Sequence, residues 1–171
     1  MKNFQNKHVL ITGGARGIGK QIGVEFAKKG ANIIICDLDK QFFNPEEFKS
    51  NVKDIENLGV QCFGYQLDVT NVEEIKTTRD KILKDIGKID IIVNNAGIVF
   101  GGKFLELSID QHKKTYDVNT QGIINMLHVF LPDLITQRES HIVNIASASG
   151  FTALPGGASY ASSKAAVSSL S

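Results

Sequence analysis

A tyrosine and a lysine stand four residues apart near the end of the sequence, at Tyr160 and Lys164. If this segment is helical, both side chains lie on one helix face. A tyrosine hydroxyl titrates at about pH 10, so it is a poor base at neutral pH unless a nearby ammonium favours the phenolate. The pair could therefore transfer a proton. Such a pair also arises by chance on helix surfaces.

A serine that could assist this pair precedes it. Ser147 follows the apolar run 141–146, and its hydroxyl could donate a hydrogen bond to a substrate oxygen on which negative charge develops. Ser149 is a rival for this role, and an ordinary turn serine is the structural alternative. Asn119 lies further upstream, in the segment V-N-T-Q-G at 118–122.

A glycine-rich segment, T-G-G-A-R-G-I-G at 12–19, follows the first apolar run. In a strand–turn–helix context, such glycines allow a tight turn, a close approach of the backbone to a pyrophosphate, and close packing of helix on strand. The helix that follows offers free N–H groups and a partial positive charge to phosphates. The candidate cofactor-binding residues here are Gly13, Arg16, Gly17, Ile18 and Gly19.

The acid at Asp37 bears on the choice of nucleotide. It ends the second apolar run, where a dinucleotide-binding fold places a carboxylate against the adenosine ribose hydroxyls. A carboxylate there would repel a 2′-phosphate, which favours NAD over NADP. Arg16 favours NADP weakly, because a cation in the turn could meet that phosphate. A solvated acid at a strand end is the structural alternative for Asp37.

The elements that position these residues alternate along the chain. Short, continuously apolar runs predict buried strands at 7–12, 31–36, 61–67, 89–93 and 141–146. Helical spacing predicts helices at 17–29, 45–58, 72–86, 108–138 with a bend near Pro132, and from 159 onwards. This alternation predicts an α/β fold, a Rossmann-type doubly wound parallel sheet with helices on both faces. Ligands then bind beyond the carboxyl ends of the strands, where every candidate residue falls.

Composition excludes several classes of function. The chain has 171 residues and a net charge of +1, so nothing indicates binding to nucleic acid. We find no candidate membrane span or signal peptide, and we expect a cytoplasmic protein. The cysteines, Cys36 and Cys62, lie in strand-like runs and are expected to be buried thiols. The histidines form no metal-ligand pattern, so no metal site is predicted.

Taken in order, the motifs resemble those of the short-chain dehydrogenase/reductase family over essentially the whole chain. They are T-G-x-x-x-G-x-G at 12–19, N-N-A-G at 94–97, V-N-x-x-G at 118–122, Ser147, and Y-x-x-x-K at 160–164. The resemblance implies an NAD(H)-dependent oxidoreductase that interconverts a secondary alcohol and a ketone or aldehyde. Its catalytic residues would be Asn119, Ser147, Tyr160 and Lys164, with Tyr160 as general acid/base. Tyr160 and Lys164 would also contact the cofactor, and Asn119 would support a water that connects Lys164 to solvent.

The resemblance also implies further cofactor contacts. Asn95 would be mainly structural, with Ala96 and Gly97 beside the nicotinamide ribose. Asp68 and Val69 would hold the adenine, although a helix-capping Asp68 is a comparable alternative.

Several expectations concern the substrate and the extent of the domain. The segment 151–155 would line an apolar pocket, and 140–164 is slightly more similar to the lipid, retinol and hydroxysteroid branch. We expect one domain, 1–171, without the family's later strands and substrate lid, and a homo-oligomer at full length. The chain of 171 residues by itself would then have little activity. The alternative is a remnant that binds nucleotide or a partner protein and catalyses nothing.

Overall fold

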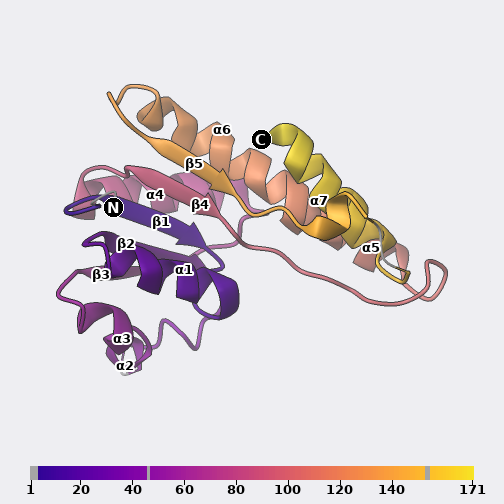
Figure 1. Ribbon diagram of the computed structural model, residues 1–171, viewed down its shortest axis with the longest axis horizontal. Helices are drawn as coiled ribbons and strands as arrows, with labels where there is room; N and C mark the ends of the chain where they lie inside the picture. The colour runs from indigo at the N-terminus through magenta and orange to yellow at the C-terminus, as the bar shows by residue number, and fades with distance from the viewer. Residues whose placement is uncertain (1–3, 46, 153–154) are drawn as a thin grey trace.

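The computed structural model describes residues 4–45, 47–152 and 155–171. Its strands form one parallel sheet in the order β3-β2-β1-β4-β5 (Figure 1). They are β1 (His8–Thr12), β2 (Asn32–Asp37), β3 (Cys62–Gln66), β4 (Ile91–Asn94) and β5 (His141–Asn144). The order runs outward from β1 in both directions, so a topological switch point lies between β1 and β4. Ligands of such sheets bind in the crevice outside the carboxyl ends of the strands at that point.

β1, β2 and β4 are largely buried on both faces, which explains their continuously apolar sequences. The expectation of a buried strand at 141–146 is wrong in part, because β5 is the edge strand and His141, Ile142 and Val143 are exposed. Side chains alternate along β1, so that Val9 and Ile11 join one core cluster and Leu10 joins the other. The cluster of Val9 includes Ala27 and Ile55 from the helices on its side. The predicted fold class, an α/β Rossmann-type doubly wound sheet, is therefore confirmed.

The helices cover the sheet in two layers. α1 (Gly17–Ala27) and α3 (Lys53–Glu56) pack on one face, while α4 (Val72–Ile86) and α6 (Gly122–Leu134) pack on the other. Two further helices, α5 (Ile109–Tyr116) and α7 (Ala158–Leu170), extend side by side past the carboxyl edge of the sheet (Figure 1). This arrangement places α7, which carries Tyr160 and Lys164, at the edge where the fold binds ligands.

The helix predicted over 45–58 is wrong as a single element. Two short helices replace it, α2 (Phe48–Asn51) and α3, and the backbone leaves helical geometry at Val52 with φ −109° and ψ 5°. Residue 46 lies outside the described residues. Val52 is completely buried, and Phe48 packs over Gly64 of β3, where a side chain would collide with the ring. Packing of these apolar groups on the sheet therefore overrides the helical pattern.

The helix predicted over 108–138 is also divided. α5 begins with a capping box between Ser108 and Gln111, and a π-helical turn, Asp117–Gln121, joins it to α6, which ends at Leu134. Pro132 lies within the last turn of α6, so the interruption falls at the π-helical turn instead of near Pro132. Asn119 stands in the middle of this turn, and π-helical turns are frequent at functional sites.

Neither cysteine forms a disulfide; Cys36 is buried as expected, whereas Cys62 is only half-buried, because it lies on the edge strand β3. Burial, followed by the charge of Asp37, raises the pKa of the Cys36 thiol far above its usual range, and burial raises the pKa of Cys62 to about 12. Within the described residues, no group of three or more histidine, cysteine or acidic side chains is arranged to hold a metal ion. No helix in that part of the chain is long and apolar enough to cross a membrane.

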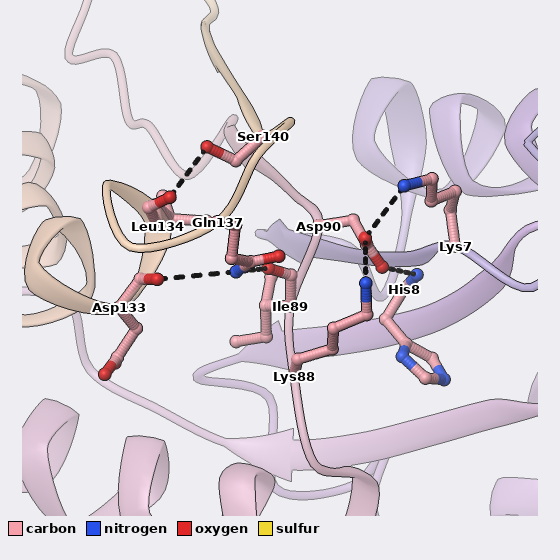
Figure 2. Close-up of polar contacts among 9 residues, drawn as sticks. All are labelled: Lys7, His8, Lys88, Ile89, Asp90, Asp133, Leu134, Gln137 and Ser140. Atoms are coloured by element: carbon pink, nitrogen blue, oxygen red, sulfur yellow. Dashed lines mark hydrogen bonds and ion pairs between the residues drawn. The ribbon is translucent and has the colours of Figure 1, made fainter.

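A buried carboxylate ties the strands together at the edge opposite the candidate site (Figure 2). Asp90 precedes β4, and its side chain is 2% exposed. Its Oδ1 accepts hydrogen bonds from Lys7 Nζ at 3.1 Å and Lys88 Nζ at 2.8 Å, and its Oδ2 accepts one from the backbone N–H of His8 at 3.0 Å. Burial alone would raise the pKa of Asp90, but these donors outweigh it and lower the pKa below its usual value.

We expect Asp90→Asn to lower the free energy of unfolding at pH 7 by about 2 kcal/mol, because two lysines then lose a buried counter-charge. The native pKa lies below the usual value of 3.8, so this stabilisation is present above about pH 4 and is lost as the pH falls through the native pKa. Urea unfolding of both proteins at pH 7 and at pH 3 measures the difference. Glu73→Gln removes the exposed pair with Lys76 and serves as the control, with no measurable change expected. A difference for Asp90→Asn that persists undiminished at pH 3 would contradict this account.

Candidate active site

The glycine turn connects β1 to α1 at the switch point. Gly13 and Gly17 have φ of 62° and 57°, in the left-handed region that favours glycine. A Cβ on Gly19 would lie 2.5 Å from Asn95 Nδ2 and closer still to the carbonyl oxygen of Gly13, whereas a Cβ on Gly17 would meet nothing within 4 Å. Gly19 is thus required for packing. Gly17 borders open space, so a ligand can approach the backbone there.

The first turn of α1 is free to bind an anion. No side chain of the described residues caps this helix, and its first turn carries no acidic residue. Arg16, at the N-cap, has an extended backbone and an exposed side chain, and Ile18 is exposed as well. The backbone N–H groups of this first turn donate to no side chain in the described part of the protein. They are therefore available to the oxygens of a pyrophosphate.

Asp37 lies beside the glycine turn at the end of β2. Its Oδ2 accepts a hydrogen bond from the backbone N–H of Ala15 at 3.0 Å, and its Oδ1 accepts one from Asp39 N–H at 3.2 Å. Each carboxylate oxygen can accept a further hydrogen bond, so ribose hydroxyls still find acceptors there. Asp37 therefore supports the turn and remains able to contact a nucleotide.

Thr12 and Asn95 join the ends of β1 and β4. Thr12 Oγ1 accepts hydrogen bonds from the N–H groups of Asn95 and Ala96, both at 3.0 Å, and Asn95 Nδ2 donates to the carbonyl oxygens of Thr12 and Gly13, also at 3.0 Å. These bonds hold the glycine turn against the segment that continues to Gly97. The hydroxyl of Thr12 was missed by sequence reasoning, although its place directly before the first glycine was a usable signal.

Asp68 and Val69 follow β3. Asp68 Oδ1 accepts hydrogen bonds from the N–H and the hydroxyl of Thr70, at 2.8 and 2.7 Å. The side chain that caps α4 is Asn71, so the alternative interpretation of Asp68 as the helix cap is wrong. Val69 is buried against Gly122. The second oxygen of Asp68 has no partner in the described part of the chain and could accept from an adenine amine.

Lys164 is buried in the middle of α7. It is 4% exposed, and its Nζ donates a hydrogen bond to the carbonyl oxygen of Ile145 at 2.6 Å. Burial lowers the pKa of Lys164 below its usual range. A Cβ placed on Gly97 would lie 3.5 Å from Lys164 Nζ and 3.3 Å from Asn119 Oδ1, so these predicted site residues, from three separate segments, meet at one point.

Tyr160 and Ser147 both precede this lysine in the chain, Tyr160 on α7 and Ser147 directly after β5. Within the described residues, the Tyr160 hydroxyl forms no hydrogen bond, and Ser147 Oγ accepts one from Ser149 N–H at 3.2 Å. Ser147 caps a short 3-10 turn, Ala148–Gly150, and Gly150 lies against the backbone of α7 at Lys164. The turn is therefore held against the helix that carries Tyr160 and Lys164. Ser147 keeps its own O–H as a donor.

Asn119 fastens three segments together. It is fully buried; its Oδ1 accepts from Ile98 N–H at 2.8 Å, and its Nδ2 donates to Ile98 O at 2.9 Å and to Ser163 Oγ at 3.1 Å. Both amide hydrogens are in use. A water near Lys164 would therefore bind to a carbonyl oxygen of Asn119 and not to its amide N–H groups.

A row of serines on α7 was missed by sequence reasoning. Ser159 bonds to His112, Ser162 accepts from the Tyr116 hydroxyl at 2.6 Å, and Ser163 accepts from Asn119. The sequence does contain polar residues at helical spacing on α7 and on the segment of α5 and the π-helical turn. It does not show that these two helical faces pack against each other. The predicted pocket segment 151–155 is only partly described: Phe151 is 82% exposed, while residues 153 and 154 lie outside the described residues.

A doubly wound parallel sheet with a glycine turn at its switch point defines a Rossmann-type nucleotide-binding fold. The family model for short chain dehydrogenases matches residues 7–171. The chain belongs to this family, as the motifs predicted.

Individual relatives extend this result. The chain is 37% identical over 164 residues to a 3-oxoacyl-(acyl-carrier-protein) reductase of Thermotoga maritima, covering 96% of this chain and 65% of that protein. It is 34% identical to human 17-beta-hydroxysteroid dehydrogenase 13, covering 95% of this chain and 53% of that protein. The structure of an NAD+-bound xylitol dehydrogenase superposes with a TM-score of 0.89 at 30% identity, covering 99% of this chain and 64% of that one. The chain thus spans less than two thirds of the length of these relatives.

Proposed function

We propose that the protein is an NAD(H)-dependent oxidoreductase that interconverts a secondary alcohol and a ketone or aldehyde, with Tyr160 as general acid/base. The observation that carries this proposal is the arrangement on α7. A buried Lys164, which lies beside Gly97, and a Tyr160 whose hydroxyl has no partner among the described residues stand on one helix at the ligand-binding edge of the sheet.

NAD fits the residues present. The open side of Gly17 and the uncapped start of α1 suit the pyrophosphate, and Asp37 suits the adenosine ribose. Gly97, Tyr160 and Lys164 would border the nicotinamide ribose. When bound, NAD supplies the acceptor or donor of a hydride at its nicotinamide ring. The NAD+ bound to the xylitol dehydrogenase of similar fold supports the same choice here.

The side chains of this chain would handle the proton. In the reducing direction, the Tyr160 hydroxyl donates its proton to the substrate oxygen, which becomes a hydroxyl group. The ammonium of Lys164 favours the resulting phenolate, and Ser147 donates a hydrogen bond to the same substrate oxygen as charge develops. The proton returns to Tyr160 from solvent through Lys164 and a water held at Asn119.

The substrate is proposed to be fairly apolar. Val99, Phe104 and Phe151 are exposed apolar side chains on the segments after β4 and after Ser147. The relatives act by name on 3-oxoacyl groups, hydroxysteroids and xylitol, all with an oxygen on a carbon chain or ring. A panel of 3-oxoacyl thioesters, hydroxysteroids, retinol, alicyclic alcohols and polyols, assayed through NADH absorbance, tests the proposal. Binding of NADH without turnover of any member would instead favour the non-catalytic remnant. The protein used in these assays is the whole product of its gene.

We expect NADH to bind at least about tenfold more tightly than NADPH, because the Asp37 carboxylate repels a 2′-phosphate. Asp37→Asn keeps an oxygen that can accept from the Ala15 N–H but removes the negative charge. It should therefore reduce the difference between the NADH and NADPH affinities, mainly by strengthening NADPH binding. Fluorescence titration with both nucleotides measures the ratio. Asp54→Asn removes one charge from the helix α3 and should leave the ratio unchanged. Equal affinities in the unaltered protein would refute the role of Asp37.

A further inference from the structure

His112 connects two parts of the candidate site that are distant in sequence. Its ring lies on α5, with Nδ1 2.6 Å from Ser159 Oγ and Nε2 3.0 Å from the carbonyl oxygen of Phe104. The Phe104 ring lies over the imidazole at a centroid distance of 4.7 Å and an interplanar angle of 30°. Ser159 directly precedes Tyr160 on α7, and Phe104 lies in the segment that follows β4 and Gly97.

For the neutral imidazole, these contacts define the direction of both hydrogen bonds. A carbonyl oxygen only accepts, so Nε2 must carry a proton to bond to Phe104. In the neutral ring Nδ1 is then an acceptor, and the Ser159 hydroxyl donates to it. Ser159 is 8% exposed, so little water is available to replace the imidazole as its partner. Each nitrogen of His112 thus holds a different segment.

We propose that His112 is a positioning residue: it links the position of Tyr160 on α7 to the position of the segment 99–107, which lies on the substrate side of the site. This inference rests on the proposed function. The Ser159 bond fixes the first turn of α7, where Tyr160 stands, and the Phe104 bond fixes the segment after β4. A misplacement of a catalytic group by about 1 Å costs on the order of a hundredfold in rate, so a coupling of this kind affects turnover.

Two substitutions separate the two bonds. Asn is shorter, so His112→Asn can accept from Ser159 but does not reach Phe104; we expect KM to rise several-fold with kcat nearly unchanged. His112→Gln is longer and can donate to Phe104 but leaves Ser159 unpaired, so we expect kcat to fall by roughly tenfold with KM nearly unchanged. His112→Phe keeps the ring contact, loses both bonds and should combine both effects. The dissociation constant for NADH should change less than kcat and KM in all three, because the glycine turn and Asp37, which would hold the pyrophosphate and the adenosine ribose, are not in contact with His112.

Tyr116→Phe is the matched control, because it removes the other hydrogen bond between α5 and α7, that from Tyr116 to Ser162. If His112 only stabilised the helix pair, Tyr116→Phe and His112→Phe would alter kcat and KM alike, which would overturn the proposal. Failure of the proposed function is a separate result, since the unaltered protein would then turn over no substrate.

Hydrogen exchange tests the coupling without any substrate. In His112→Phe, amides of 99–107 and of 158–162 should both exchange faster than in the unaltered protein, whereas Tyr116→Phe should leave 99–107 unchanged. Unchanged exchange of either segment in His112→Phe would overturn the proposal even in a protein without activity.

Discussion

Tyr160→Phe is expected to lower turnover by roughly a hundredfold to ten-thousandfold, the range that a positioned general acid/base contributes. The substitution removes only the hydroxyl, and that hydroxyl forms no hydrogen bond within the described residues. The aromatic ring and its packing stay, so both folding and NADH binding should be preserved. Steady-state rates with a substrate found in the panel, together with fluorescence titration of NADH, measure the two effects separately.

Tyr116→Phe provides the control for this experiment as well. It is the same chemical change on α5, and it even removes a hydrogen bond to α7, the one to Ser162. We expect near-normal turnover from this variant. If Tyr160→Phe keeps roughly a tenth or more of the normal rate, the proton must pass through another group, and the proposed role of Tyr160 is wrong.

The second large effect is expected at Gly19. Gly19→Ala places a methyl group 2.5 Å from Asn95 Nδ2 and against the carbonyl oxygen of Gly13, both parts of the tightly bonded turn. The turn must shift, at an expected cost of about 1–3 kcal/mol to the stability of the free protein. Because NADH must restore the original turn in order to bind, we expect a loss of affinity of similar size, roughly fivefold to a hundredfold. NADH titration measures the loss of affinity, and urea unfolding separates it from a general loss of stability.

Gly23→Ala on the same helix is the matched control. Its Cβ would lie 3.4 Å from Ile11 Cδ1 and Ile33 Cγ2, which is ordinary van der Waals contact, so neither neighbour has to move. Because alanine favours a helix interior over glycine by about 0.5–1 kcal/mol, this variant should be as stable as the unaltered protein or slightly more stable, with normal NADH binding. Equal NADH affinity in Gly19→Ala and Gly23→Ala would show that the turn does not hold the nucleotide.

The sequence predicted those elements in which local pattern and tertiary packing agree. The runs at 7–12 and 31–36 are apolar throughout because both faces of the sheet are buried, and the structure places β1 and β2 there. The predicted helix at 45–58 failed because Val52 and Phe48 pack on the sheet at the expense of helical geometry. Local periodicity contains no information about that contact.

The residues of the candidate site also divide into those that local sequence identifies and those that depend on tertiary packing. Gly13, Gly17 and Gly19 could be identified because a strand–turn–helix motif restricts their backbone directly. The hydrogen bonds of His112 and Ser163 could not, because they depend on which face of α5 meets α7. The helix-capping alternative for Asp68 was wrong because Asn71, three residues later, has the same capacity to cap.

The hydrogen bonds around Asp90, here called the Asp90 cluster, are separate from the candidate site, and this affects how the protein can evolve. Asp90, Lys7 and Lys88 join strands at one edge of the sheet, and none of them belongs to the site at the other edge. Most substitutions destabilise a protein, so new specificities arise more readily where a reserve of stability is maintained elsewhere. Residues after β4 and after Ser147 can therefore vary with a new substrate while the cluster at the opposite edge preserves the fold. A laboratory selection for altered substrate range should accordingly accumulate substitutions in 98–107 and 148–158 and leave Asp90 unchanged.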